Sequence, residues 1–240
     1  MKAALLLLLL LCGTAVNAFA SGCDLSVTSC PGYFGNSHEA GMLDCAGGGT
    51  LQLLATFRPA EAITDLVGAD CVLDFCVQGD VTSVANFWDM ETSNAAALST
   101  SGARPAFGCP NYYPAFGQVG SGSAALAARL TDSMVRIHTT SYRPTPLAVA
   151  VNQGVFAIQV LIDTGTSAEA SGSAQNGCQT PNAITLEQVQ PVSLNNGPST
   201  TLDYGSESIG SQFVYVNSYG GGVTVAARQH SWGALKALYR

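Results

Sequence analysis

The most informative hydrophobic pattern in the sequence is a pair of apolar runs, Leu147–Val151 and Val155–Ile162, separated by Asn152-Gln153-Gly154. In the second run seven of eight positions are apolar, so both faces of an extended strand would be apolar. This pattern predicts a central strand covered on both sides, and the β-branched and aromatic content favours a strand over a helix. One face would carry Val155, Ala157, Gln159 and Leu161, and the other Phe156, Ile158, Val160 and Ile162.

Further short apolar or alternating runs predict the other strands. Arg58-Pro59 interrupts the pattern after the first of them, and we interpret Ala60–Val67 as a short helix or a wrapped loop. Residues 21–49 are expected to form a loop-like arm, because glycine, proline and serine separate their cysteines. The predicted strands are Thr50–Phe57, Ala69–Gln78, Ser121–Arg129, Met134–Tyr142, Ile184–Val189 and Gln212–Asn217.

Short strands, many turns and no long helical pattern predict an all-β protein. We expect one domain over residues 21–219, built as a two-sheet β-sandwich of jelly-roll type and stabilised by disulfides. The main alternative is a β-helix or solenoid, which would repeat at a fixed period. The sequence shows no such repeat.

The N-terminus has the three parts of a secretory signal peptide. Met1-Lys2 supplies a positive charge, Ala3–Leu11 an apolar core, and Ala18-Phe19-Ala20 a cleavage site of small residues. The apolar core is shorter than the ~20 residues that span a bilayer. We therefore expect residues 1–20 to be removed and the protein to be secreted or held at the cell surface, with no transmembrane segment after cleavage.

The cleavage region also resembles a bacterial lipobox, Ala20-Ser21-Gly22-Cys23, although a lipobox usually has leucine at the first of these positions. Cleavage after Ala20 leaves seven cysteines, whereas a lipid on Cys23 would leave six to pair. Lipid anchoring through Cys23 is therefore an alternative to free secretion.

An exported protein meets an oxidising environment, so disulfides are expected. Cys71 and Cys76 lie five positions apart on one predicted strand and would point to opposite faces. Each is therefore expected to bond to a distant partner such as Cys45, Cys109 or Cys178. The candidate cysteines are Cys23, Cys30, Cys45, Cys71, Cys76, Cys109 and Cys178.

A zinc site is an alternative interpretation of Cys30, His38 and Cys45. Their spacings match no metal-binding pattern, and the expected compartment favours disulfides. We predict no metal site and no cofactor.

The low content of charged residues and the negative net charge indicate which classes of partner the chain can bind. Charged residues make up 10% of the sequence, against about 25% in typical globular proteins, and the net charge is −7. Nucleic-acid binding requires a basic stripe, so we expect no nucleic-acid partner.

Three aromatic residues, Trp88, Tyr112 and Tyr113, lie in predicted loops near Asn and Asp. Such rings can stack on the apolar face of a sugar, which makes them candidates for a glycan-binding surface. Large aromatic side chains are more often buried, and the alternative is that these residues close the end and rim of the sandwich.

The segment Asp163-Thr164-Gly165 follows an apolar strand and resembles the active-site element of aspartic proteases. That chemistry requires two carboxylates that share a proton. The sequence contains no second Asp-Thr/Ser-Gly, and for a dimeric enzyme Ile209-Gly210 is a poor supporting segment. We therefore predict no catalytic residue and interpret the motif as a strand end followed by a turn, with Asp163 as the alternative.

The C-terminal residues 220–240 begin with three glycines, and Ser231–Arg240 is predicted to form a short amphipathic helix capped by Ser231. The ending SWGALKALYR resembles the W-G-x-x-K-x-L-Y-R ending of secreted bacterial β-rich proteins that have no assigned activity. The signal peptide, the strand VFAIQVLID and the segment AITLEQVQ extend this resemblance to about half the chain. The resemblance implies export and a β fold, and it implies no functional residue.

Taken together, these features predict an exported, non-enzymatic structural or adhesive protein with a cell-surface partner. A glycan-binding module that uses Trp88 and the two tyrosines is one alternative. A dimeric aspartic protease that uses Asp163 is the other.

Overall fold

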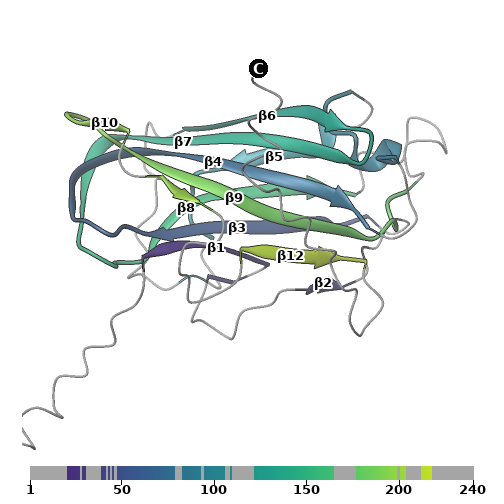
Figure 1. The fold of residues 1–240 in the computed structure, drawn as a ribbon, viewed down its shortest axis with the longest axis horizontal. Helices are drawn as coiled ribbons and strands as arrows, with labels where there is room; N and C mark the ends of the chain where they lie inside the picture. Colours follow the sequence, from purple (N-terminus) through teal and green to yellow (C-terminus); the bar gives the residue numbers. More distant parts are fainter. Residues whose placement is uncertain are drawn as a thin grey trace, which may run out of the picture.

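The protein is a sandwich of two β-sheets in a computed structural model (Figure 1). The four-stranded sheet has the order β1-β3-β8-β5, and the eight-stranded sheet has the order β2-β12-β9-β4-β7-β6, with β10 and β11 paired to β9. The structure describes residues 21–27, 29–30, 39–41, 43, 45, 48–78, 83–92, 95–105, 109, 122–164, 177–198, 201–203 and 212–217.

The strands of the four-stranded sheet are β1 (Gly22–Val27), β3 (Thr50–Arg58), β8 (Val155–Asp163) and β5 (Leu98–Ser101). Those of the eight-stranded sheet are β2 (Glu39–Gly41), β12 (Phe213–Val216), β9 (Asn182–Ser193), β4 (Ile63–Val77), β7 (Met134–Val149), β6 (Gly122–Thr131), β10 (Gly197–Pro198) and β11 (Leu202–Asp203). Two short 3₁₀ helices, η1 (Asn86–Trp88) and η2 (Ala95–Ala97), lie between β4 and β5.

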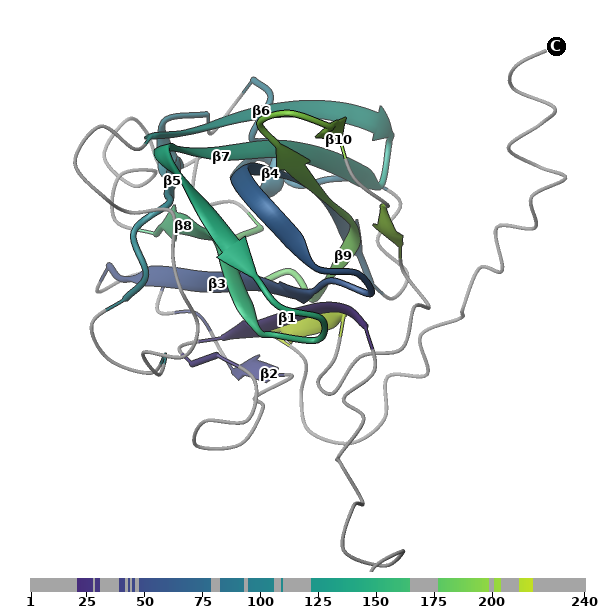
Figure 2. The same ribbon diagram turned by 90° about the vertical axis from the view of Figure 1, so that its left-hand side faces the viewer.

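The topology confirms the predicted all-β, jelly-roll-like sandwich. Most successive strands alternate between the two sheets, and antiparallel partners far apart in sequence, such as β3 with β8 and β4 with β9, form the centres of the sheets. Figure 2 shows β6 and β7 at one end of the sandwich and β1 and β2 at the other. In the part of the chain that the structure describes, no helix is long and apolar enough to cross a membrane.

Strand β8 is a central strand, as its sequence predicts: it pairs with β3 on one side and β5 on the other. The two apolar runs do not pair with each other, because the first forms the end of β7 and belongs to the opposite sheet. The turn between them therefore carries the chain across the sandwich. Its Asn152 adopts a positive φ of 58°, a conformation that asparagine tolerates better than most residues.

The predicted division of β8 into two faces is wrong at one end, because a β-bulge interrupts the alternation. Ala55 pairs with Ile158 and Thr56 with Phe156, so Ala157 is the extra residue. Phe156 consequently leaves the face of Ile158 and packs outside the main core.

The bulge is tied to the facing sheet by a buried hydrogen bond. Ser141 on β7 donates its hydroxyl hydrogen to the carbonyl oxygen of Ala157 across 2.7 Å. Both side chains are fully buried, so without this hydroxyl the carbonyl group would have no access to water. The bond therefore fixes the separation of the two sheets at the bulge.

Strand β4 has the alternation that its sequence predicts: Cys71, Leu73 and Phe75 are buried in the core. The helix or loop predicted over Ala60–Val67 is wrong, because β4 begins at Ile63 and continues for 15 residues. Two register shifts around Leu66 allow this long strand to bend while it stays paired with β7 and β9.

The loop-like arm predicted over residues 21–49 is also wrong at its start. Gly22–Val27 forms β1, which pairs with β3 and is buried along its whole length. Only six residues alternate here, and the strand is recognised through its pairing with β3. Arg58 at the end of β3 forms an ion pair with the buried Asp24 at 3.9 Å.

Two disulfides connect distant parts of the chain, Cys30–Cys109 and Cys45–Cys178. The first covers the outer face of the four-stranded sheet, where it packs with Leu54 and Phe156.

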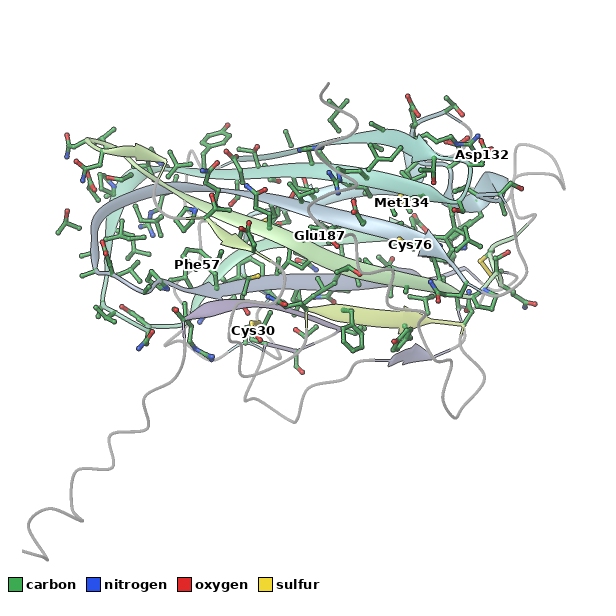
Figure 3. The ribbon with its side chains drawn as sticks, viewed as in Figure 1. Cys30, Phe57, Cys76, Asp132, Met134 and Glu187 are labelled. Atoms are coloured by element: carbon green, nitrogen blue, oxygen red, sulfur yellow. A yellow bond between two sulfur atoms is a disulfide. The ribbon has the colours of Figure 1, made fainter. Side chains whose placement is uncertain are left out.

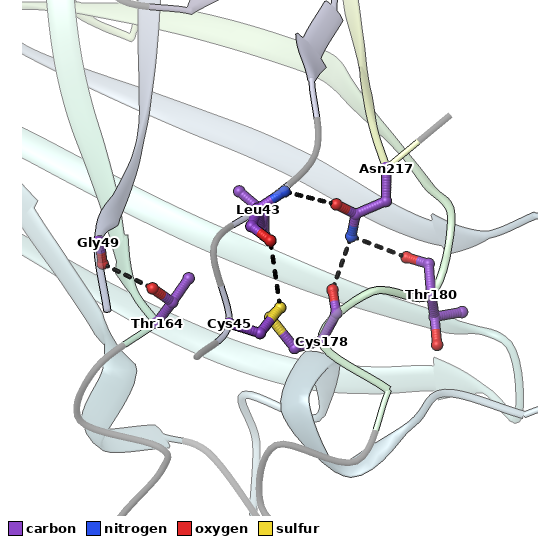
Figure 4. Close-up of a disulfide and its surroundings, with 7 residues drawn as sticks. All are labelled: Leu43, Cys45, Gly49, Thr164, Cys178, Thr180 and Asn217. Atoms are coloured by element: carbon purple, nitrogen blue, oxygen red, sulfur yellow. Dashed lines mark hydrogen bonds between the residues drawn. A yellow bond between two sulfur atoms is a disulfide. The ribbon is translucent and has the colours of Figure 1, made fainter. Parts of the chain in front are cut away.

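The second disulfide lies beside Asn217 (Figure 4). The Asn217 side chain accepts a hydrogen bond from the amide of Leu43 at 2.8 Å and donates one to the carbonyl oxygen of Cys178 at 2.6 Å. The segment before β3 is thus attached to the start of β9 and the end of β12.

The distant partners predicted for Cys71 and Cys76 are wrong. Both residues, and also Cys23, carry thiols in this structure. Cys71 points into the core and lies among apolar residues such as Leu73 and Phe75.

The inter-sheet hydrogen bond yields a first prediction. Ser141→Ala should destabilise the protein by about 1–3 kcal/mol, because it leaves a buried carbonyl group without a partner. Thr145→Ala, which removes an exposed hydroxyl from the same strand, is the matched control. Urea denaturation measures both, and equal midpoints for the two variants would contradict the assigned role of Ser141.

Candidate functional site

The strand end at Asp163 forms part of the ladder between β3 and β8. Asp163 pairs in register with Thr50, the first residue of β3. Thr164 is buried, and its amide donates to the carbonyl oxygen of Gly49 at 2.8 Å. Its hydroxyl donates to the same oxygen at 3.0 Å (Figure 4). The Asp-Thr pair therefore closes the end of the two strands; Gly165 lies outside the described residues.

Trp88 lies in the core rather than on a binding surface. Its side chain is 0% exposed, and its ring contacts Phe87 edge-on, with 4.9 Å between ring centroids, and Phe75 at 6.2 Å. A buried ring cannot stack on a sugar, so Trp88 is corrected from a glycan-binding candidate to a core residue. Tyr112 and Tyr113 lie outside the described residues.

The two cysteines of the alternative zinc site form disulfides instead. Cys30 and Cys45 are each bonded to another cysteine, and a disulfide sulfur does not provide the thiolate that zinc requires. His38 lies outside the described residues. Among the residues the structure describes, no group of three His, Cys, Asp or Glu side chains is arranged to hold a metal ion.

The buried thiols are poor nucleophiles. Burial in the core raises the pKa of Cys71 well above its ordinary value, and the nearby Cys23 raises it further. Cys23 itself is fully buried; its thiol lies 3.6 Å from the carbonyl oxygen of Leu202 and accepts a hydrogen bond from Gln212 at 3.2 Å. Because the thiolate is the reactive form, Cys71 is a poor nucleophile at this position.

A pair of charged residues lies on the outer face of the eight-stranded sheet, and it is the arrangement in the described chain that most resembles a functional site. Arg136 on β7 donates two hydrogen bonds to the carboxylate of Asp74 on β4, at 2.7 and 2.6 Å. The two residues are directly opposite in register, and Asp74 is buried although it faces outward. This bidentate pair joins the two central strands and raises the pKa of Arg136.

Glu187 lies beside this ion pair on the same sheet; Figure 3 shows it with Cys76 and Met134. The register shift between Val72 and Leu73 makes Glu187 the extra residue of a bulge in β9. Burial raises its pKa, the negative charge of Asp74 raises it further, and Arg136 acts in the opposite direction. The three groups form a local charge network, which sequence periodicity does not reveal because it depends on the bulge.

The hairpin of β6 and β7 presents apolar side chains to solvent. Leu126 is 70% exposed, Tyr142 is 53% exposed, and Leu130, near the end of β6, is 46% exposed. Leu126 lies opposite His138 and Tyr142 lies opposite Gly122, so both project from the outer face of the sheet. We call Leu126, Leu130 and Tyr142 the hairpin patch.

The ring of Tyr142 lies directly over Gly122 of β6. A side-chain carbon at this position would lie 2.2 Å from the Tyr142 hydroxyl oxygen and 2.4 Å from its ring. The tyrosine ring therefore covers the glycine backbone at the start of the edge strand, an arrangement known to compensate for glycine in sheets.

Strand β6 is the edge of the eight-stranded sheet, since its only strand partner in the described chain is β7 (Figure 1). It is ten residues long, and the residues from Gly122 to Ala128 include no charged side chain. Natural edge strands usually carry charges, prolines or a cover that prevents further pairing. An edge of this length and composition is suited to contact with another chain.

One end of this edge has a cover. The amide of Arg129 donates to the carboxylate of Glu91 at 2.7 Å, and its guanidinium group donates to Asp89 at 3.3 Å. These acidic residues follow η1, so the segment that buries Trp88 also blocks the last part of the edge.

Comparison with known proteins identifies no family. No protein-family model matches the chain, and no curated protein matches it. A solved structure with some similarity is a cohesin module from the Clostridium perfringens ATCC13124 family 33 glycoside hydrolase. It covers 83% of this chain and 99% of the module at 10% identity, with a TM-score of 0.34, which supports no inference about function.

The charge network yields a prediction about pH. Because the pKa of Glu187 is higher in the folded than in the unfolded state, the folded state binds more protons between these two pKa values. Stability attributable to Glu187 should therefore fall as the pH rises through this window. Glu187→Gln should remove that dependence and raise the thermal midpoint at neutral pH.

The control is Glu61→Gln, which replaces an exposed carboxylate next to β3. Thermal denaturation from pH 4 to pH 8 measures both variants. A lower midpoint of Glu187→Gln at neutral pH would show that the carboxylate stabilises the sheet there.

Proposed function

We propose that the protein is an exported, non-enzymatic interaction module that binds its partner through the hairpin patch and the adjoining edge of β6. The observation that carries this proposal is that three exposed large apolar side chains, those of Leu126, Leu130 and Tyr142, lie along one hairpin. Among the described residues, the only other large apolar side chains that are exposed are those of Val151 and Leu194. Apolar groups concentrated on one surface are typical of sites of protein contact.

Export is supported by the N-terminal sequence and by the two disulfides, which persist in oxidising compartments. We place the protein outside the cytosol, released or held at the cell surface by its partner. The complete burial of Cys23 argues against a lipid on its sulfur, because the core around it has no space for an acyl chain.

A non-enzymatic role is supported by the surroundings of Asp163. Its strand position opposite Thr50 and the bonds of Thr164 to Gly49 give the Asp-Thr pair a structural purpose. Asp163→Asn should therefore leave partner binding unchanged, and the purified protein should show no pepstatin-sensitive cleavage of unfolded protein substrates at acid pH. Cleavage that is lost in Asp163→Asn would overturn the non-enzymatic proposal.

The hairpin patch is tested by a charge substitution. Leu126→Asp should reduce retention of the labelled protein on the cells that export it by about tenfold or more, because burying a charge at an apolar contact is costly. Leu194→Asp is the matched control, since Leu194 is 62% exposed but lies on the turn after β9.

Retention is measured by the fluorescence of labelled protein on washed cells. Far-UV circular dichroism checks that both variants fold. Equal retention of the two aspartate variants would exclude the hairpin patch as the binding surface.

A further inference from the structure

We propose that the open edge of β6 pairs with the same edge of a second copy of this chain, antiparallel and centred on Ala125. The two eight-stranded sheets then form one continuous sheet. This inference rests on the proposed function and names the partner: another molecule of the same protein.

The backbone direction follows from the hydrogen bonds of the neighbouring strand. The amide of Val77 donates to the carbonyl oxygen of Ser133, so Ser133 and, two residues on, Val135 direct their backbone groups toward β4. Val135 is the register partner of Arg129, which must therefore direct its own backbone groups away from β7. The bond from the Arg129 amide to Glu91 agrees with this direction.

Alternate residues of a strand point the same way, so the backbone groups of Ser123, Ala125 and Ala127 also face away from β7. No described strand pairs with them. Arg129 differs from these three because its amide already donates to Glu91. Among the residues that the structure describes, the open edge thus consists of the backbone groups of Ser123, Ala125 and Ala127. The side chain of Ser123 is not open, because its hydroxyl oxygen accepts a hydrogen bond from Thr100 on β5 at 3.1 Å.

Two-fold symmetry then selects the register. When Ala125 faces Ala125 of the second copy, Ser123 faces Ala127, and all three open residues of each chain pair with open residues. A register shifted by one residue toward the C-terminus would place Ser123 opposite Arg129, whose amide is occupied. A shift toward the N-terminus would leave Ala127 without a partner among the open residues. Only the pairing centred on Ala125 uses the complete open edge.

The side chains fit this register. On the outer face, Leu126 meets Ala124 of the second copy, and Gly122 meets Ala128, so each larger residue faces a smaller one. No charged side chain lies within Gly122–Ala128, and the two Arg129 side chains fall outside the paired segment. An uncharged edge with self-complementary sizes favours a second copy over a charged peptide, which would require an opposing charge.

Self-pairing is tested with two substitutions at Ala125. Proline removes the outward N–H without affecting the bonds to β7, and edge strands tolerate proline at such positions. Serine keeps the N–H. Sedimentation velocity over rising concentrations of the purified mature chain should show a monomer–dimer equilibrium for the wild type and Ala125→Ser. For Ala125→Pro, we expect dimerisation to weaken at least tenfold.

Circular dichroism and the thermal midpoint check that Ala125→Pro folds as the wild type does. If it does not fold, the crosslinking variants below provide the test. A wild type that stays monomeric at every concentration, or a folded Ala125→Pro that dimerises as the wild type does, would overturn the proposal.

The register is tested by crosslinking. Residues directly opposite in a hydrogen-bonded pair have Cα atoms about 5.5 Å apart, within the range that a disulfide spans. Ala125→Cys should therefore form a disulfide-linked dimer under mild oxidation, whereas Ala127→Cys, two residues away, should not. The reverse result, or equal crosslinking of both variants, would overturn the pairing centred on Ala125.

The two proposals fail in different ways. If cell retention requires Leu126 but the wild type is monomeric and Ala125→Cys does not crosslink, the interaction module stands and the partner is a different protein. If the dimer forms as predicted but retention does not depend on Leu126, self-pairing stands and the proposed attachment to cells fails.

Discussion

The fold depends on the burial of β8, which extends to both of its faces over Val155–Ile158. Its inner face packs against the eight-stranded sheet, and its outer face is covered where Phe156 meets Leu54 and the Cys30–Cys109 disulfide. The bulge at Ala157 allows this double burial, because it turns Phe156 outward while Ile158 stays in the core. At Val155–Ile158, where every residue is buried, the strand contributes hydrophobic stabilisation from both sides. Further along, Gln159, Leu161 and Asp163 are partly exposed.

The other sheet has the opposite character on its outer face. There, Asp74, Arg136 and Glu187 replace a hydrophobic cover with a charge network across the central strands. The hairpin of β6 and β7 extends beyond this network, with Leu126 and Tyr142 in solvent. The four-stranded sheet is thus the closed, disulfide-covered side, and the eight-stranded sheet is the side that offers a contact surface and a strand edge.

The sequence predicts much of the architecture where periodicity is local. Strand Thr50–Phe57 and the alternation along β4 follow from the spacing of apolar residues, and so does the central position of β8. What it does not predict depends on contacts distant in sequence. The bulge that turns Phe156 is set by the pairing with β3, and the partner of Cys30 is 79 residues away.

In the candidate site, too, the sequence predicts local features but not those that depend on contacts distant in the chain. The sequence predicts a strand over Ser121–Arg129, which matches β6, but only the sheet order reveals that it is an edge. The cover at Arg129 depends on Glu91, 38 residues earlier in the chain. Conversely, the sequence offers Trp88 and Asp163 as candidates because tryptophan is common in binding sites and aspartate in active sites. In the structure Trp88 lies in the core and Asp163 lies at the end of a strand.

The central claim is that one edge of the eight-stranded sheet is open and selects its partner by backbone pairing. Residue-resolved amide hydrogen exchange along β6 tests this most directly. At low protein concentration, the amides of Ala124 and Leu126 should be protected by β7 while those of Ala125 and Ala127 exchange rapidly, and the latter two should become protected as the concentration rises. Protection of Ala125 and Ala127 already at low concentration, or rapid exchange of both at every concentration, would contradict the account.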